Sequence, residues 1–398
     1  FQMYDPEVTR RITIRDLLCH RSGIGTFQGD LASFNSIYDR AEVMRRIRFI
    51  EPVYEFREGY GYSNSMFLTA GLIIPRVTDS SWDEFIETRL FAPLGMGRSN
   101  TSLGEFEAVT NTATPHGLVD GEIVPIPHDS VDNMAPAGSI NSSANDMAQW
   151  LLLQTGDGEY GGEQIVDPAV ISETRKPHNL QQVSDAAKKL NPWTHFSSYG
   201  LGWSLSDYRG RLVVSHGGGL PGMVAYVALL PEENLGIAVL VNFDLHGLRQ
   251  SVVNHVIDAY LGAEPHDWAG IYFERVERIL EAREGAKARR EEERIKNTRP
   301  SLAPEAYVGP YTSTIYGDAE VTFEDGVLTL DPKAHPAVSG RLEHWHLDTY
   351  LCTWTDSFWD QSMVYFDLDD AGKVSQFRFT VRPAVLDPLE YVFVKQQE

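Results

Sequence analysis

Apolar residues in the first half of the chain recur at the spacing of short amphipathic helices. The first such segment, Thr13 to His20, begins with a capping threonine, carries Asp16 three residues later and is followed by Ser22-Gly23. Further helices are predicted at Asn64 to Ile73, Trp82 to Phe91 and Ser143 to Gly156. We expect Pro75 to stop or kink the second helix, because proline lacks the backbone N–H that a helix uses.

Beyond residue 210 the pattern changes to apolar runs that are separated by short turns. Strands are predicted at 212–214, 223–230 and 235–241. The turn Pro231 to Asn234 joins the last two, and connections this short predict antiparallel neighbours. An amphipathic helix from Leu248 to Leu261 closes this part of the chain.

The last third of the chain begins with a highly charged stretch, residues 266–300, in which acids alternate with bases. This pattern predicts a solvated helical linker. Short strand patterns then recur around turns such as Glu324-Asp325-Gly326. They lie at 319–323, 327–330, 350–354, 363–367 and 374–381. Regular short strands with turn signals predict a small β-barrel or sandwich.

The patterns together predict an α/β fold, in which helices flank an antiparallel sheet and a helical cluster lies beside it. A small all-β, barrel-like domain is expected to follow. The predicted boundaries are 1–265 for the first domain, 266–300 for the linker and 301–398 for the β-domain.

Composition narrows the classes of partner. The chain has 398 residues, with 34 bases, 56 acids and a formal net charge of −22, so a nucleic acid is not expected as a partner. No apolar run is long enough to span a bilayer, and an integral membrane segment is therefore not expected. The only cysteines, Cys19 and Cys352, provide neither a disulfide framework nor a cysteine-based zinc site.

Two segments contain candidate functional residues. Gly61 to Ser65 precedes an apolar helix, so a loop there would present Tyr62 and Asn64 at the helix N-terminus. His216-Gly217-Gly218-Gly219 ends a predicted strand, where residues without side chains let another backbone approach and leave N–H groups free. Taken alone, each segment favours a structural role. For Tyr62 and Asn64 this role is a core tyrosine and a capping asparagine, and for residues 216–219 it is a glycine-rich turn.

The chain resembles the class C β-lactamase group of penicillin-recognising serine hydrolases over about residues 1–262. The matching blocks are Ile12 to Ile24, Tyr62-Ser63-Asn64, Phe91 to Met96, Pro136 to Ser139 with Asp146, Tyr199 to Trp203 and Ser215 to Gly222. The C-terminal segment, from Tyr307 to Tyr311 and through Tyr316 to Val321, looks like the lipocalin-like β-domain that some members carry.

The resemblance implies an acyl-enzyme mechanism that uses three sequence elements. A Ser-x-x-Lys helix supplies the nucleophile, a Tyr-x-Asn loop supplies a proton-transfer tyrosine and a substrate-binding asparagine, and a Lys-Thr-Gly strand lines the site. Tyr62 and Asn64 match the loop, with Tyr62 as the catalytic residue and Asn64 as substrate-binding.

The strand element matches His216, Gly217 and Gly218 as substrate-binding residues, with the backbone N–H of Gly219 as an oxyanion donor. One such donor typically lowers the activation free energy by about 2.7 to 4 kcal/mol. Here His216 replaces the lysine of the family. Because histidine titrates near neutral pH, we expect activity to change with pH in that range.

No serine in the chain has a lysine three positions later, so the nucleophile of the family is absent from these residues. In the family this helix lies upstream of the Ile12 block. We therefore expect an N-terminally truncated chain that is inactive as it stands. The complete protein is expected to hydrolyse an ester, an amide or a peptide without a metal or an organic cofactor, as an esterase or D-amino-acid peptidase rather than a true β-lactamase.

Three alternatives differ in class. An α/β-hydrolase would need a Gly-x-Ser-x-Gly elbow, which the chain lacks. His344 and His346 would share one face of a strand, but two ligands are too few for a metal site, and packing beside Trp345 is favoured. The third is a non-catalytic binding or scaffold protein with the penicillin-recognition fold. The resemblance also suggests export to the periplasm or secretion, and the β-domain allows a homo-oligomer.

Overall fold

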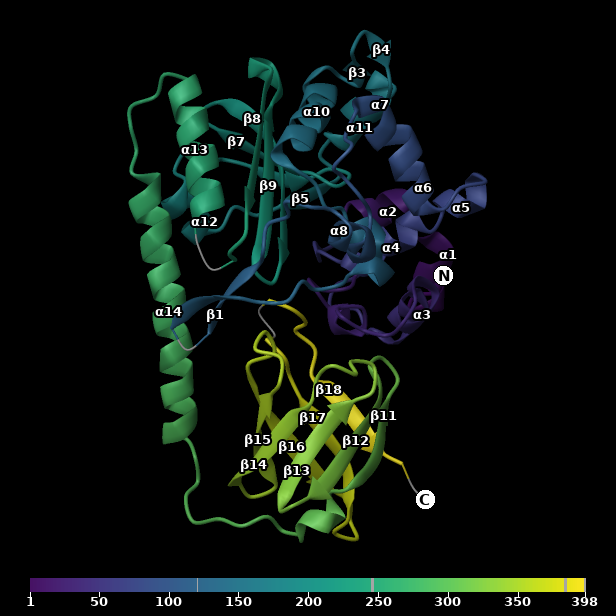
Figure 1. The fold of residues 1–398 in the computed structure, drawn as a ribbon, viewed down its shortest axis with the longest axis vertical. Helices are drawn as coiled ribbons and strands as arrows, with labels where there is room; N and C mark the ends of the chain where they lie inside the picture. The colour runs from purple at the N-terminus through teal and green to yellow at the C-terminus, as the bar shows by residue number, and fades with distance from the viewer. Residues whose placement is uncertain (120, 245–246, 383–384, 397–398) are drawn as a thin grey trace.

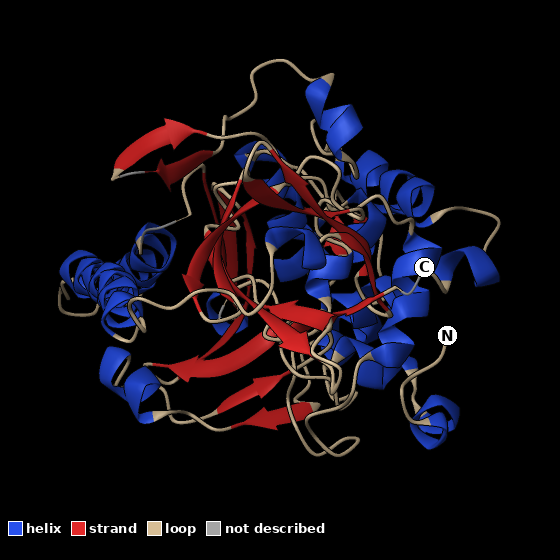
Figure 2. Ribbon diagram, turned by 90° about the horizontal axis from the view of Figure 1, so that it is seen from below, coloured by secondary structure: helices blue, strands red, loops and turns tan. Residues whose placement is uncertain are grey.

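The computed structural model describes residues 1–119, 121–244, 247–382 and 385–396. A helical cluster and a β-sheet form the upper part of the molecule in Figure 1, and a β-barrel forms the lower part. Viewed from the barrel end in Figure 2, helices lie on opposite sides of the strands. This is the predicted α/β architecture with an appended all-β domain.

A six-stranded antiparallel sheet is the framework of the upper part, with the order β10-β9-β8-β7-β6-β5. Its strands are β5 (Asn179–Gln181), β6 (Ser197–Tyr199), β7 (Ser204–Tyr208), β8 (Arg211–Leu220), β9 (Met223–Leu230) and β10 (Leu235–Val241). The predicted hairpins of the second half are therefore confirmed. Two-stranded hairpins add β1 (His116–Val119) with β2 (Glu122–Pro125) and β3 (Glu159–Tyr160) with β4 (Glu163–Gln164).

Helices cover both faces of this sheet because successive strand residues point to opposite sides. On one face, Val214 and Leu229 pack with Leu151 of α10 (Ala144–Thr155). On the other face, Leu230 packs with Val253 of α13 (Leu248–Tyr260). Ser143 caps α10 as predicted, since its side chain accepts a hydrogen bond from the N–H of Asp146.

The helical cluster consists of short helices. They are α1 (Pro6–Arg11), α2 (Ile14–Leu18), α3 (Arg40–Arg46), α4 (Asn64–Gly71), α5 (Ile74–Val77), α6 (Trp82–Ile86), α7 (Ala92–Leu94), α8 (Leu103–Glu107), α9 (Ala135–Gly138), α11 (Pro168–Thr174) and α12 (Asp185–Leu190). Thr13 and Asp16 form a capping box at the start of α2. Pro75 lies in the first turn of α5, so the predicted helix from Asn64 ends earlier, at Gly71. The predicted helix at Trp82 continues past α6 as a π-helical turn at Glu87–Phe91.

Eight antiparallel strands close into the C-terminal barrel, with β11 and β18 completing the ring. They are β11 (Gly309–Ser313), β12 (Gly317–Glu324), β13 (Val327–Pro332), β14 (Gly340–His346), β15 (Thr349–Trp354), β16 (Gln361–Leu368), β17 (Val374–Phe379) and β18 (Tyr391–Lys395). Buried aromatic side chains, including Tyr311, Phe366 and Phe377, pack inside it. Closure leaves the strands of this domain without a free edge.

The helix α14 (Trp268–Glu292) runs beside both parts of the molecule (Figure 1). The sequence predicts a solvated linker here, but the first turns pack on α13, where the Trp268 Nε1–H donates to Asp258 at 2.8 Å. Just beyond the other end, the Arg294 guanidinium lies 4.3 Å from the ring centre of Trp345 and donates to its carbonyl. The helix is thus anchored at both ends.

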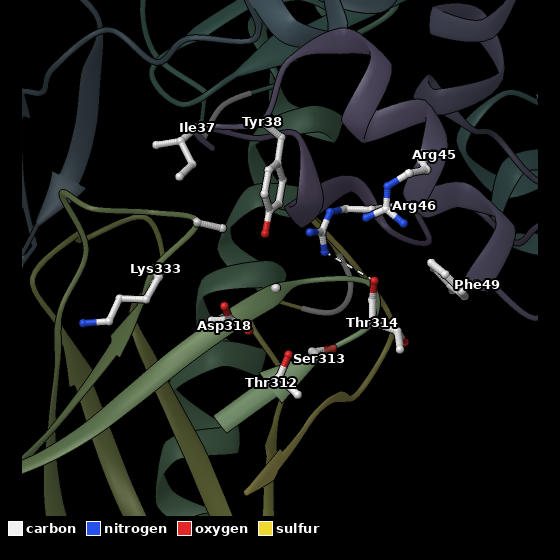
Figure 3. A pocket seen from close by; sticks show the side chains of 12 residues that line it. Ile37, Tyr38, Arg45, Arg46, Phe49, Thr312, Ser313, Thr314, Asp318 and Lys333 are labelled. Carbon is white, nitrogen blue, oxygen red and sulfur yellow. Dashed lines mark hydrogen bonds between the residues drawn. The ribbon is translucent and has the colours of Figure 1, made fainter. Parts of the chain in front are cut away.

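The barrel also contacts the helical cluster directly. Arg46 of α3 donates to the carbonyls of Thr314 and Ile315, at 3.3 and 2.9 Å (Figure 3). The Arg46 guanidinium is 4.0 Å from the ring centre of Tyr38, whose hydroxyl donates to the barrel at Tyr316. These contacts border a cavity of about 410 Å³ in which Arg46 already pairs with Glu42.

Candidate active site

The sheet has a free edge beside the glycine run of β8. Strand β7 pairs with β8 only as far as Ser215, opposite Ser204. Strand β9 continues to pair with β8 up to Leu220. One backbone edge of the segment from His216 to Gly219 therefore lacks a neighbouring strand within the described chain, and its three glycines are exposed. An edge of this kind can bind another extended chain by main-chain hydrogen bonds.

Packing within the fold does not demand glycine at the end of this run. A Cβ atom added to Gly218 or Gly219 would meet its nearest neighbour at 3.8 or 3.7 Å, which is an ordinary contact. Both residues lie in a paired strand rather than in a turn. The run is therefore part of a strand and not a simple glycine-rich turn, and its missing side chains leave the strand surface open.

The loop that carries Tyr62 is held in place by its backbone. Gly61 passes so close to the Ile24 carbonyl that an added Cβ would lie 1.8 Å from the oxygen, so only glycine fits there. The N–H of Phe27 donates to the Tyr62 carbonyl at 2.8 Å, and the N–H of Tyr62 donates to the Thr26 hydroxyl. These bonds fix the direction in which the phenol leaves the loop.

His20 lies beneath this loop and is completely buried. Its Nδ1 accepts the N–H of Ser63 at 3.1 Å, and its ring packs between those of Tyr62 and Phe67, with centres 4.4 and 5.0 Å away. Burial, together with the nearby His216, lowers the pKa of His20 to about 3. The position of His20 after a helix suggests a structural hydrogen-bonding role, and these contacts agree with that role.

Asn64 begins α4 and is oriented by a buried carboxyl group. Its Nδ2–H donates to Asp30 at 2.6 Å, which leaves its carbonyl oxygen available to accept a hydrogen bond. Burial, together with Asp387, raises the pKa of Asp30 well above its usual value. Asp387 comes from the segment after β17 and accepts the N–H of Leu31, so the barrel helps to position the residues behind Asn64.

Tyr62 and His216 face each other, with ring centres 6.0 Å apart. The structure therefore brings the predicted loop residue and the predicted strand residue together. Burial raises the pKa of Tyr62 to about 12, and Asp30 adds to this shift. Burial also lowers the pKa of His216 below its usual value, and His216 Nε2 lies 3.0 Å from the Tyr199 hydroxyl.

The site opens into a cavity of about 430 Å³ that both parts of the molecule line. Asn64 and Gly219 contribute from the upper part, and Phe358 and Leu386 from the barrel loops. A larger cavity of about 670 Å³ adjoins the other side of the same strand, where Gly218 and Gly219 line it together with Ser139. Of the predicted residues, Asn64, Gly218 and Gly219 thus border open space.

Sequence reasoning missed several residues of this site. Asp30 and Tyr199 act on Asn64 and His216 from distant segments, and Arg249 donates to the Gly218 carbonyl at 2.7 Å. Arg249 lies at the start of a predicted helix near the strand end, so the sequence gives only a weak indication that it belongs to the site. Asp30 offers none, because only the folded chain brings it to Asn64.

The histidines considered for a metal site have other contacts. His344 Nε2–H donates to the Leu347 carbonyl at 3.0 Å, and the His344 ring packs against Tyr350. His346 Nδ1 accepts the N–H of Ile295 at 3.2 Å. A bulge between the two residues shifts the strand register. Both side chains thus take part in local packing and hydrogen bonding at the end of the linker.

Comparison with protein families decides where this fold belongs. Residues 3–258 match the family described as Beta-lactamase, which is well over half of the chain. The chain belongs to the beta-lactamase family. Residues 293–390 match a domain of unknown function, DUF3471, which includes most of the barrel.

Curated relatives of this family member include a hydrolase and a penicillin-binding protein. The unguisins hydrolase ungD' of Aspergillus campestris is 26% identical over 339 residues, covering 78% of this chain and 58% of the relative. Penicillin-binding protein 4 of Amycolatopsis lactamdurans is 28% identical over 254 residues, covering 61% of this chain and 62% of the relative. The chain thus spans about three fifths of the length of these relatives.

Among solved structures, an octameric penicillin-binding protein homologue from Pyrococcus abyssi aligns with a TM-score of 0.58 and 21% identity. The alignment covers 99% of this chain and 83% of that one, so the similarity in fold includes the barrel. Within the described residues, no helix is both long and apolar enough to cross a membrane.

Proposed function

We propose that this chain is the larger part of a serine hydrolase that cleaves an ester, an amide or a peptide through an acyl-enzyme. The observation that carries the proposal is that Tyr62 faces His216 at the free edge of β8, while Asn64 of the same loop and Gly219 of the same strand line one cavity. The relatives named as a hydrolase and as a penicillin-binding protein support the same class of chemistry.

The nucleophile is proposed to come from residues upstream of Phe1. No serine of the chain belongs to a Ser-x-x-Lys motif. The serines beside the site are also poorly placed for attack, since Ser63 is buried and Ser215 accepts the Tyr226 hydroxyl at 3.0 Å. An upstream serine could enter the site from the side of the larger cavity, next to Gly218 and Gly219.

In this proposal Tyr62 moves the proton of the nucleophile to the leaving group. A phenol whose pKa is about 12 is a poor base at neutral pH, so a cation must lower it. His216 is mainly neutral there, because burial lowers its pKa. A lysine that accompanies the upstream serine would supply the charge, since a unit charge 4 Å away interacts by roughly 4 kcal/mol at an effective dielectric constant of 20.

The other residues bind the substrate. Asn64, held by Asp30, offers its carbonyl oxygen to a substrate N–H. The exposed backbone of Gly217 pairs with an extended substrate, and the N–H of Gly219 stabilises the oxyanion. Gly218, whose carbonyl accepts from Arg249, binds the substrate by leaving the strand surface open to it. His216 stays fixed through Tyr199 and fills the place of the family's lysine.

A labelling experiment tests this proposal. The upstream coding sequence is added to the chain, and both versions are treated with a fluorophosphonate probe and with a fluorescent penicillin. We expect one serine of the added segment to be labelled in the longer protein, and the present chain to remain unlabelled. Labelling of a serine within residues 1–398 would contradict the assignment of the nucleophile.

The same experiment separates the enzyme from a non-catalytic scaffold. A longer protein that folds, contains Ser-x-x-Lys upstream and still hydrolyses no ester, β-lactam or D-peptide substrate would favour the scaffold.

Self-association of this chain is a separate proposal. Light scattering of the purified protein tests it by measuring the molar mass.

A further inference from the structure

The barrel contributes an arginine to the wall of the smaller cavity. Arg382 follows β17 and lines the cavity of about 430 Å³ that also contains Asn64 and Gly219. The barrel lies directly below the sheet in Figure 1, so its loops reach the end of β8. This position makes Arg382 a part of the candidate site that the chain acquires only when the barrel is docked.

Most of the hydrogen-bonding capacity of Arg382 is unused. Its side chain donates one bond, from Nη1 to the Phe358 carbonyl at 3.2 Å, and its guanidinium lies 4.5 Å from the Phe358 ring centre. Within the described residues, no carboxylate lies within 4 Å of it. A guanidinium carries five N–H donors in a planar fork that matches a carboxylate. Phe358 therefore holds the group in place without occupying that fork.

A second arginine lines the cavity beside Arg382. Arg283 of α14 lines the same space. Burial of Arg382 is the main cause of its lowered pKa, and the charge of Arg283 is the second cause. Of the acids in the cavity wall, Asp244 opposes these charges, whereas burial favours the neutral form of Asp30. Two further acids near Arg382 lie outside the wall, namely Asp356 and Asp360. The wall is thus locally cationic in a chain with a net charge of −22.

We propose that Arg382 binds a carboxylate group of the substrate, so that the enzyme prefers acyl compounds that carry a negative charge near the scissile bond. This specificity rests on the proposed function, because it concerns the substrate of the same site. Leu220 and Leu386 line the same cavity as Arg382, and their apolar surface fits a short hydrocarbon linker.

A binding measurement tests the anion site without any need for catalysis. Succinate, glutarate and adipate are titrated into the present chain by calorimetry, with 1,6-hexanediol as the uncharged control. We expect at least one dicarboxylate to bind, and Arg382→Met to weaken that binding by about tenfold or more. Arg382→Lys should retain part of the affinity. Arg378→Met is the matched control, since Arg378 pairs with Asp367 and Glu390 on the barrel surface and should leave affinity unchanged.

A kinetic measurement on the longer protein tests the specificity itself. The ratio of kcat/KM for p-nitrophenyl hemiadipate to kcat/KM for p-nitrophenyl methyl adipate measures the preference for the charge. We expect a ratio well above one that falls by about tenfold in Arg382→Met and stays unchanged in Arg378→Met. Thermal unfolding confirms that each variant is folded.

The outcomes separate the two proposals. Dicarboxylate binding that depends on Arg382, in a longer protein that cleaves neither ester, would leave the anion site standing and remove the proposed function. Hydrolysis of both esters with an unchanged ratio in Arg382→Met would overturn the anion site alone. Absence of Arg382-dependent binding for all three dicarboxylates would overturn it as well.

Discussion

The two walls of the candidate site are built on different principles. On one wall, the loop that carries Tyr62 and Asn64 is backed by buried polar groups: His20 accepts the backbone N–H of Ser63, and Asp30 orients the side chain of Asn64. On the other wall, the glycines of β8 present bare backbone at an exposed strand edge. The buried residues behind the first wall contribute to stability, whereas the second wall can change function at almost no cost to the fold.

The largest effect is expected for Tyr62→Phe in the longer protein. Loss of the phenol should lower kcat by about 100-fold or more, the range for removal of a proton-transfer group. The melting temperature should hardly change, because within the described chain the Tyr62 hydroxyl has no hydrogen-bond partner. Tyr60→Phe is the matched control on the same loop and should retain activity. Equal rates for both variants would argue against Tyr62 as the proton carrier.

The strand wall is tested by Gly219→Val. A valine side chain would narrow both cavities, so kcat/KM should fall by about tenfold or more. Stability should stay the same or rise by up to about 1 kcal/mol, because glycine inside a strand is unfavourable. Steady-state kinetics and denaturant unfolding measure the two quantities. A variant that loses stability and activity together would contradict the contrast between the walls.

The loop wall is tested by His20→Phe, which keeps an aromatic ring but removes the acceptor for the Ser63 N–H. We expect a loss of about 1 to 3 kcal/mol in the free energy of unfolding at pH 7. The buried His20 has a pKa of about 3, below its value of about 6.5 in the unfolded chain. Its contribution is therefore complete above pH 6.5 and is lost as the pH falls toward 3.

The difference in stability between the wild-type protein and His20→Phe should accordingly shrink as the pH is lowered from 7 to 4. Urea unfolding at several pH values measures it. A difference that stays constant with pH would show that His20 is not buried in its neutral form.

The smallest effect is expected for Asp30→Asn, which retains an acceptor for Asn64. Because burial raises the pKa of Asp30, its contribution to stability is present at low pH and is lost as the pH rises through the folded-state pKa. Asparagine does not titrate. The free energy of unfolding of the variant should therefore differ from that of the wild-type protein by less than about 1 kcal/mol at pH 5. At pH 8 the variant should be more stable, relative to the wild-type protein, than it is at pH 5. Unfolding at the two pH values decides the sign.

Local signals in the sequence predict the framework of this molecule well. Thr13 and Ser143 cap helices through neighbours three residues away, and the strand pairs at 211–241 are joined by short turns. The loop and strand motifs are likewise contiguous in sequence, so Tyr62 and Gly218 could be singled out before the fold was known.

The partners of these motifs could not be predicted in the same way. Asp30 meets Asn64 across 34 residues, and Asp387 meets the same region from the far end of the chain. Neither residue belongs to a recurring pattern, and a buried carboxyl group looks like a surface one in sequence. Docking of the barrel, which decides what Arg382 touches, depends on contacts between segments that lie far apart along the chain.

The anchored helix α14 sets the spacing between the two halves of the site. At a rise of about 1.5 Å per residue, its 25 residues form a rod of roughly 37 Å. Inserting a single residue would rotate everything beyond it by about 100°. The contacts of Trp268 at one end and of Arg294 at the other could then not both form. A barrel taken from a relative would then fit this sheet only if the helix keeps the same number of turns. The length of α14 therefore determines which barrel residues reach the site and, with them, the specificity.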